Sequence, residues 1–92
     1  MRSPMSVPEA HRREAPKSVR FSVVIVSTSR YEALKAGREG PPDLTGDLLC
    51  RLLAETGHEV ISRRVAPDDI WALRSVLEEE ARKGVDAIIF AG

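Results

Sequence analysis

Three short apolar runs alternate with two segments of helical periodicity along this chain. The runs cover residues 21–27, 59–65 and 85–91 and are rich in β-branched residues, which is typical of strands in a parallel sheet. The first and third runs are the most apolar and are expected at central positions, whereas the second suits a sheet edge. The βαβαβ order predicts right-handed crossovers and a mainly parallel sheet covered by helices, an α/β fold.

Each helical segment carries its own start signal. Leucines at helical spacing over residues 44–53 predict a first helix, which Asp43 or Thr45 caps. An apolar stripe over residues 70–81 predicts a second helix, with Asp68 as its N-cap. The end of this second helix offers ion pairs at i,i+4 spacing on a solvated face: Glu78 with Arg82 and Glu79 with Lys83.

The first 20 residues differ in composition from the rest. They hold five basic and two acidic residues, three prolines and little to bury, while residues 21–92 hold nine basic and twelve acidic residues. We therefore expect residues 1–20 to form an extended basic arm and residues 21–92 to form the folded domain. The arm is either a disordered tail or a segment that packs on a neighbouring subunit.

The overall charge of the chain disfavours nucleic acid and membrane surfaces as binding partners. The formal net charge is zero, so no global field draws the chain to nucleic acid or to a membrane surface. No apolar run approaches the length of a membrane span, and no secretory signal follows the N-terminal arginines. The single cysteine, Cys50, excludes an intrachain disulfide. A cytoplasmic location is the expectation.

The most apolar run lies at the end of the chain, at residues 85–91. A parallel sheet needs cover on both faces, and two helices are few for that purpose. An uncovered strand exposes apolar surface and an unpaired edge. We expect either that other subunits provide the cover or, preferably, that residues 21–92 are the first half of a larger domain.

Candidate chemistry follows the first strand. In open α/β sheets, ligands bind beyond the carboxyl ends of the strands. The connection over residues 28–42 is long and, with Ser27 before it, offers Ser29 and Arg30, whose hydroxyl and guanidinium groups suit phosphate oxygens. It matches neither a dinucleotide-binding nor a P-loop motif. The alternative is a solvated loop, part of which, residues 30–36, forms a short surface helix.

Two further segments leave the same end of the sheet. Asp43, Thr45 and Gly46 begin the first helix, where a glycine lets an anion approach free backbone amides; simple capping is the alternative. Asp68 and Asp69 follow the second strand, and two adjacent carboxylates are suited to Mg²⁺ with phosphate oxygens and water. The alternative for this pair is an N-cap followed by an acid that favours the helix dipole.

Several sequence motifs occur in an order that resembles a known family. They are Ala-Pro-Lys-Ser-Val at 15–19, Val-Ser-Thr-Ser-Arg-Tyr at 26–31, Asp-Leu-Thr-Gly-Asp-Leu-Leu at 43–49, Ala-Glu-Thr-Gly-His-Glu-Val at 54–60, Pro-Asp-Asp at 67–69, Gly-Val-Asp-Ala-Ile-Ile at 84–89 and Ala-Gly at 91–92. Together they resemble the N-terminal half of the MoaB/MogA family of molybdenum cofactor biosynthesis proteins. The resemblance extends over residues 15–92.

The resemblance implies a three-layer α/β/α fold that assembles as a homo-oligomer, a trimer or hexamer. It implies a molybdopterin site and, in active members, adenylylation of molybdopterin with ATP and Mg²⁺. Asp68 carries over as the catalytic, Mg²⁺-associated carboxylate. Gly92 would begin the family's Gly-Gly-Thr-Gly loop. The residues implied to bind substrate are Ser27, Ser29, Arg30, Asp43, Thr45, Gly46 and Gly92.

One departure from the family pattern keeps an alternative open. Thr28 stands where the family often has an aspartate in its Ser-Asp-Ser-Arg segment. A non-catalytic pterin-binding or scaffold protein of the same fold is therefore the second interpretation. A receiver-like signalling domain is a more distant one, because it requires an acid pair at the first strand exit, and this chain has none there.

Overall fold

The computed structural model describes residues 18–92, so the arm predicted over residues 1–20 lies almost wholly outside the described residues. Arg20 already belongs to the first strand. Across the described part of the chain, no helix is long and apolar enough to cross a membrane. The elements are β1 (Arg20–Val26), α2 (Thr28–Lys35), α3 (Leu44–Glu55), β2 (Glu59–Ala66), α4 (Ile70–Ala81) and β3 (Ala87–Ala91).

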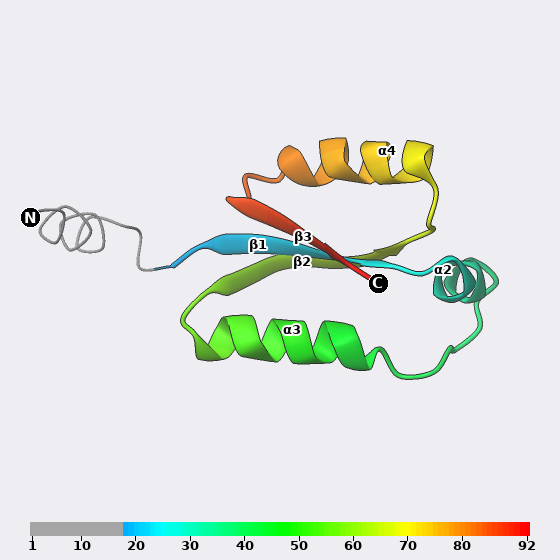
Figure 1. Ribbon diagram of the computed structural model, residues 1–92, viewed down its shortest axis with the longest axis horizontal. Coiled ribbons are helices and arrows are strands. Elements are labelled where there is room, and N and C mark those ends of the chain that lie inside the picture. Colours follow the sequence, from blue (N-terminus) through cyan, green and yellow to red (C-terminus); the bar gives the residue numbers. More distant parts are fainter. Residues whose placement is uncertain (1–17) are drawn as a thin grey trace, which may run out of the picture.

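The three strands form one parallel sheet in the order β2-β1-β3. Helix α3 covers one face and α4 covers the other, which gives three layers (Figure 1). Helix α2 lies at the end of the sheet where the strands end. The predicted α/β fold with a parallel βαβαβ arrangement is confirmed, and so are the central position of β1 and the edge position of β2.

The central position predicted for β3 refers to a larger domain and stays a prediction. Within residues 18–92, β3 pairs only with β1 and forms an edge. Its apolar residues are partly covered by α4, where an apolar groove remains open, and Phe90 is 39% exposed in that groove. The groove is lined by Val26, Ile70, Leu73, Arg74, Leu77 and Phe90. The predicted exposure of apolar surface around this strand is confirmed.

One of the two predicted N-cap residues is confirmed and the other is wrong. Asp43 caps α3, because its Oδ1 atom accepts the N–H of Gly46 at 3.0 Å. Asp69, not the predicted Asp68, caps α4 by accepting the N–H of Ala72 at 2.9 Å. Residues 28–35 form helix α2, which confirms the alternative of a short surface helix in this connection, with bounds slightly different from the expected residues 30–36.

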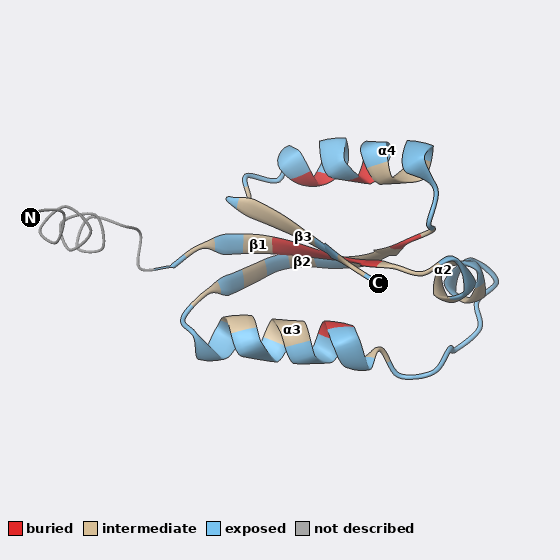
Figure 2. Cartoon of the chain, in the orientation of Figure 1, coloured by how far each residue is buried: buried red, intermediate tan, exposed pale blue. Residues whose placement is uncertain are grey.

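Alternation along β1 divides the core between the two helix layers. Val24 packs with Ala66 and Val76 beneath α4, so Val23 and Ile25 point toward α3. All three β1 residues are buried, as the red segment of β1 in Figure 2 shows. The β-branched run therefore forms a strand that is buried on both faces.

A buried carboxylate lies between β1, β2 and α4. Glu80 is fully buried; its Oε1 atom accepts the hydroxyl of Ser22 at 2.8 Å. Its Oε2 atom meets Arg64 at 3.0 Å and Lys83 at 2.7 Å. Lys83 therefore pairs with Glu80 and not with the predicted Glu79. Glu79 pairs instead with Arg64. The predicted pair of Glu78 with Arg82 is also wrong, because Arg82 forms no ion pair within residues 18–92.

This network predicts loss of stability in acid. Burial alone would raise the pKa of Glu80, but hydrogen bonds from Lys83, Ser62, Ser22 and Arg64 lower its pKa to about 2. The stabilisation is therefore fully present above the unfolded-state pKa and is lost as the pH falls from about 5 to about 2. Urea unfolding at several pH values should show a loss on the order of 3 kcal/mol over this window. Glu80→Gln should remove that pH dependence; an unchanged acid profile in this variant would contradict the assignment.

Candidate functional site

A polar cavity of about 350 Å³ opens beyond the carboxyl ends of β1 and β3. It lies between α2 and the first turn of α3. Its lining residues are Ile25, Val26, Ser27, Arg30, Pro42, Asp43, Leu44, Thr45 and Gly92. Parallel α/β sheets bind their ligands at this end, and the volume is within the range of about 300–1,000 Å³ found for small-molecule sites.

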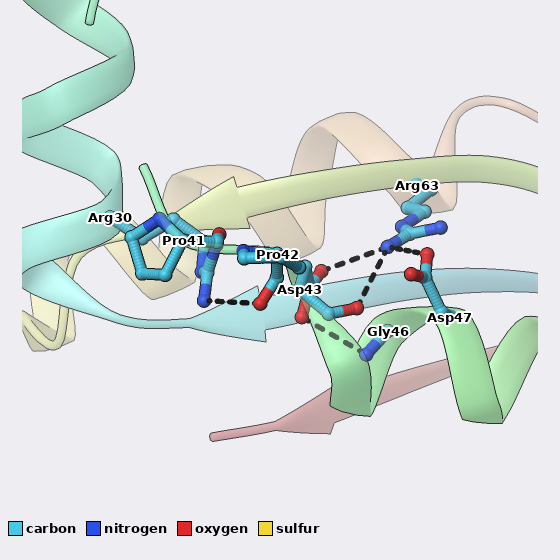
Figure 3. A network of polar contacts seen from close by, with 7 residues as sticks. All are labelled: Arg30, Pro41, Pro42, Asp43, Gly46, Asp47 and Arg63. Carbon is cyan, nitrogen blue, oxygen red and sulfur yellow. Dashed lines mark hydrogen bonds and ion pairs between the residues drawn. The ribbon is translucent and has the colours of Figure 1, made fainter. Parts of the chain in front are cut away.

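Arg30 holds the segment that leads into α3. Its Nη1 atom donates to the carbonyl of Pro41 at 2.5 Å and its Nη2 atom to that of Pro42 at 3.4 Å (Figure 3). The backbone N–H of Arg30 donates to the Ser27 hydroxyl oxygen, which caps α2. Arg30 thus lines the cavity, and its guanidinium holds the backbone of the two prolines in place through these hydrogen bonds.

Asp43 is held from two directions. While Oδ1 caps α3, Oδ2 accepts from Nη2 of Arg63 on β2 at 3.0 Å, and the same Nη2 reaches Asp47 Oδ1 at 2.8 Å (Figure 3). Burial works against ionisation, but the N–H of Gly46 and the guanidinium groups of Arg63 and Arg30 hold the pKa of Asp43 below its ordinary value. The carboxylate on the cavity wall is therefore ionised and compensated.

Gly46 leaves room for this packing. A Cβ at this position would overlap the Asp43 carboxylate and lie 2.7 Å from Arg63 Nη2, so these two side chains would have to move. Its N–H is occupied by Asp43, so the structure uses the glycine to seat the Asp43–Arg63 pair. Leu44 and Thr45 line the cavity, and their N–H groups have no intrahelical acceptor because they belong to the first turn of α3.

Asp68 lies at the same end of the sheet but does not line the cavity. Its backbone N–H donates to the hydroxyl of Thr28 at 2.9 Å, which ties the ends of β2 and β1 together. The Asp68 side chain is exposed, and within residues 18–92 no ion pair or hydrogen bond engages its carboxylate. Thr28, the residue that departs from the family pattern, therefore has a structural role here.

The structure brings together most, though not all, of the residues predicted from the sequence. Ser27, Arg30, Asp43, Thr45 and Gly92 line one cavity, although they come from three separated segments. The remaining predicted residues lie outside the lining: Gly46 within α3, Ser29 exposed on α2, and Asp68 after β2.

Sequence reasoning missed Arg63. The adjacent positions of Arg63 and Arg64 in β2 indicate only that their side chains point to opposite faces of the sheet. Each arginine meets acids of the helix on its own face, Asp43 and Asp47 for Arg63, Glu79 and Glu80 for Arg64. Nothing in the sequence alone pairs these residues.

Few side chains of the described residues are placed to bind a metal ion. Residues 18–92 contain no cluster of three or more His, Cys, Asp or Glu side chains suited to hold one. Asp69 is occupied as the cap of α4, which leaves Asp68 as the available carboxylate at this end of the sheet. This donor set fits Mg²⁺ that is bound mainly by phosphate oxygens and water, with one protein carboxylate.

These features define a class: a three-layer, parallel α/β domain with a polar pocket beyond its strand ends. A family model described as "Probable molybdopterin binding domain" matches residues 22–92. The chain belongs to this family, as its sequence motifs predicted.

Curated relatives agree with this membership. The chain is 37% identical over 89 residues to the molybdenum cofactor biosynthesis protein B of Bacillus anthracis, covering 96% of this chain and 47% of the relative. It is 32% identical over 84 residues to the molybdopterin adenylyltransferase of Pyrococcus furiosus, covering 91% of this chain and 46% of the relative. The chain therefore spans about half the length of the curated relatives it matches.

Proposed function

We propose that this chain acts in molybdenum cofactor biosynthesis and forms the phosphate-binding side of a molybdopterin adenylyltransferase. The observation that carries the proposal is the convergence of Ser27, Arg30, Asp43, Thr45 and Gly92 on one cavity beyond the strand ends. Membership of the family and the name of the Pyrococcus furiosus relative support the choice of ligand.

The cavity offers a phosphate group several donors and one cation. The free amides of Leu44 and Thr45 and the dipole of α3 favour an anion, and the guanidinium of Arg30 adds a positive charge. The hydroxyls of Ser27 and Thr45 supply further donors. These groups suit the terminal phosphate of molybdopterin.

Adenylyl transfer requires positioning more than covalent help from side chains. An oxygen of the molybdopterin phosphate forms a bond to the α-phosphorus of ATP, and the bond from that phosphorus to the bridging oxygen breaks, releasing pyrophosphate. The cavity residues hold the attacking phosphate in place, which lowers the entropic cost of the step. Asp68 is proposed to bind the Mg²⁺ of MgATP, and the ion supplies charge neutralisation at the phosphates.

A molybdopterin-binding domain without transferase activity is the second candidate. Thr28 in place of the family's aspartate favours it. The trimeric or hexameric assembly and the cytoplasmic location stay predictions in either case.

Separate calorimetric titrations with molybdopterin and with MgATP test the proposal. We expect both ligands to bind. Arg30→Met should weaken molybdopterin binding about tenfold, because it removes a charge-assisted contact to phosphate. Arg30→Lys should recover part of the affinity, since it keeps the charge.

Arg38 provides the matched control. It lies exposed in the same connection and outside the cavity lining, so Arg38→Met removes the same charge without touching the cavity. Its affinity should stay within twofold of the wild type. Molybdopterin binding without any response to MgATP would favour the non-catalytic alternative, and failure to bind molybdopterin would refute the proposal.

A further inference from the structure

Arg63 lies outside the cavity but makes its contacts with the first turn of α3. Its Nη2 atom donates to Asp47 Oδ1 at 2.8 Å, to Asp43 Oδ2 at 3.0 Å and to the backbone carbonyl of Asp43 at 3.4 Å. Because Arg63 projects from β2, these contacts join the sheet to the helix that borders the cavity. The arrangement is visible in Figure 3.

The two carboxylate oxygens of Asp43 accept hydrogen bonds from different donors. Oδ1 accepts the N–H of Gly46, and Oδ2 accepts from Arg63. The carboxylate cannot turn into the cavity without losing one of these bonds. Its charge is also compensated, although it lies on the wall of a cavity that is proposed to take an anion.

The charged groups around Asp43 explain why this compensation matters. Arg30 approaches from α2 and Arg63 from β2, while Asp47 adds a second negative charge on α3. Without Arg63, the Asp43 carboxylate on the cavity wall would be opposed by Arg30 alone, with a second carboxylate, that of Asp47, nearby on α3. Like charges at such distances are repulsive, and partial burial weakens the screening by solvent.

We propose that Arg63 is a positioning residue of the phosphate site, which holds Asp43 in its capping orientation and neutralises it so that a phosphate or pyrophosphate group can bind beside Thr45. The ligand in this inference rests on the proposed function, whereas the hold of Arg63 on Asp43 is a property of the ligand-free protein. Arg63 does not touch the ligand.

The test compares Arg63→Met with Arg51→Met. Arg51 is exposed on α3 and forms no ion pair within residues 18–92, so its replacement changes the net charge equally. The Asp43 carboxyl is titrated by ¹³C NMR in ligand-free protein, and inorganic pyrophosphate affinity is measured by calorimetry. In Arg63→Met, the pKa of Asp43 should rise and pyrophosphate binding should weaken about fivefold to tenfold.

The control and a second variant make the outcome decisive. Arg51→Met should leave both readouts at their wild-type values, and Arg63→Lys should recover part of the loss. Arg63→Gln serves as the same test should Arg63→Met fail to fold. An unchanged pKa of Asp43 in the Arg63 variants, or equal weakening of pyrophosphate binding by Arg51→Met, would overturn the role of Arg63 alone. A wild-type protein that binds neither pyrophosphate nor molybdopterin would overturn the proposed function and, with it, the role of Arg63 toward a ligand.

Discussion

Replacing Arg64 with methionine is expected to destabilise the domain by about 3 kcal/mol. Glu80 is fully buried beneath α4, and Arg64 is one of its two cationic partners. Removal of the guanidinium leaves an ionised carboxylate in the interior with Lys83 as its remaining cation. Urea unfolding at neutral pH, followed by circular dichroism, measures the change directly.

The neighbouring arginine supplies a matched control for this effect. Arg63→Met removes the same side chain from the neighbouring position of the same strand, but neither of its acid partners is fully buried: the Asp43 side chain is 16% exposed and that of Asp47 is 63% exposed. Ion pairs that solvent reaches contribute less than a fully buried one, so the expected loss is smaller, on the order of 1 kcal/mol. Equal destabilisation by the two substitutions would show that burial of Glu80 does not determine how much free energy of unfolding is lost.

Asp68→Asn is expected to lower Mg²⁺-dependent turnover of molybdopterin and ATP on the order of 100-fold, while leaving the fold unchanged. The Asp68 carboxylate is exposed and is not engaged by any side chain of residues 18–92, so an isosteric amide removes charge without disturbing packing. Pyrophosphate release measures turnover of the wild type and of the variant under the same conditions. Broadening of amide signals near Asp68 by Mn²⁺ in the presence of ATP measures metal binding independently.

The adjacent residue is the control for Asp68. Asp69→Asn also removes one carboxylate, but asparagine still caps α4 through its side-chain oxygen. Its turnover should stay within twofold of the wild type. Wild-type turnover in Asp68→Asn would refute the assignment of Asp68, and inactivity of the wild type would refute the transferase proposal itself.

Much of the fold could be predicted because local patterns determine it. The apolar run of β1 is buried by helices on both faces, and the leucines of α3 lie at helical spacing behind a single capping residue, Asp43. One error has a local physical cause. Either Asp68 or Asp69 could start α4, and only the extended backbone of Asp69 places its carboxylate on the N–H of Ala72.

The candidate site was less accessible to sequence reasoning because it depends on contacts between distant residues. Residues that follow strand ends could be expected to lie together, as Ser27 and Gly92 do. The partners of Arg63 and Glu80 could not, since each is chosen by which face of a strand or helix the side chain occupies. Glu80 in particular belongs to a charged run that resembles a solvated face.

The most direct test of the central claim is an amide NMR titration of the chain with molybdopterin. We expect the largest shifts at the cavity, in the N–H groups of Leu44, Thr45 and Gly92 and in the guanidinium of Arg30. Shifts confined to the apolar groove between α4 and β3, around Leu77 and Phe90, would contradict the claim that the cavity beyond the strand ends is the binding site.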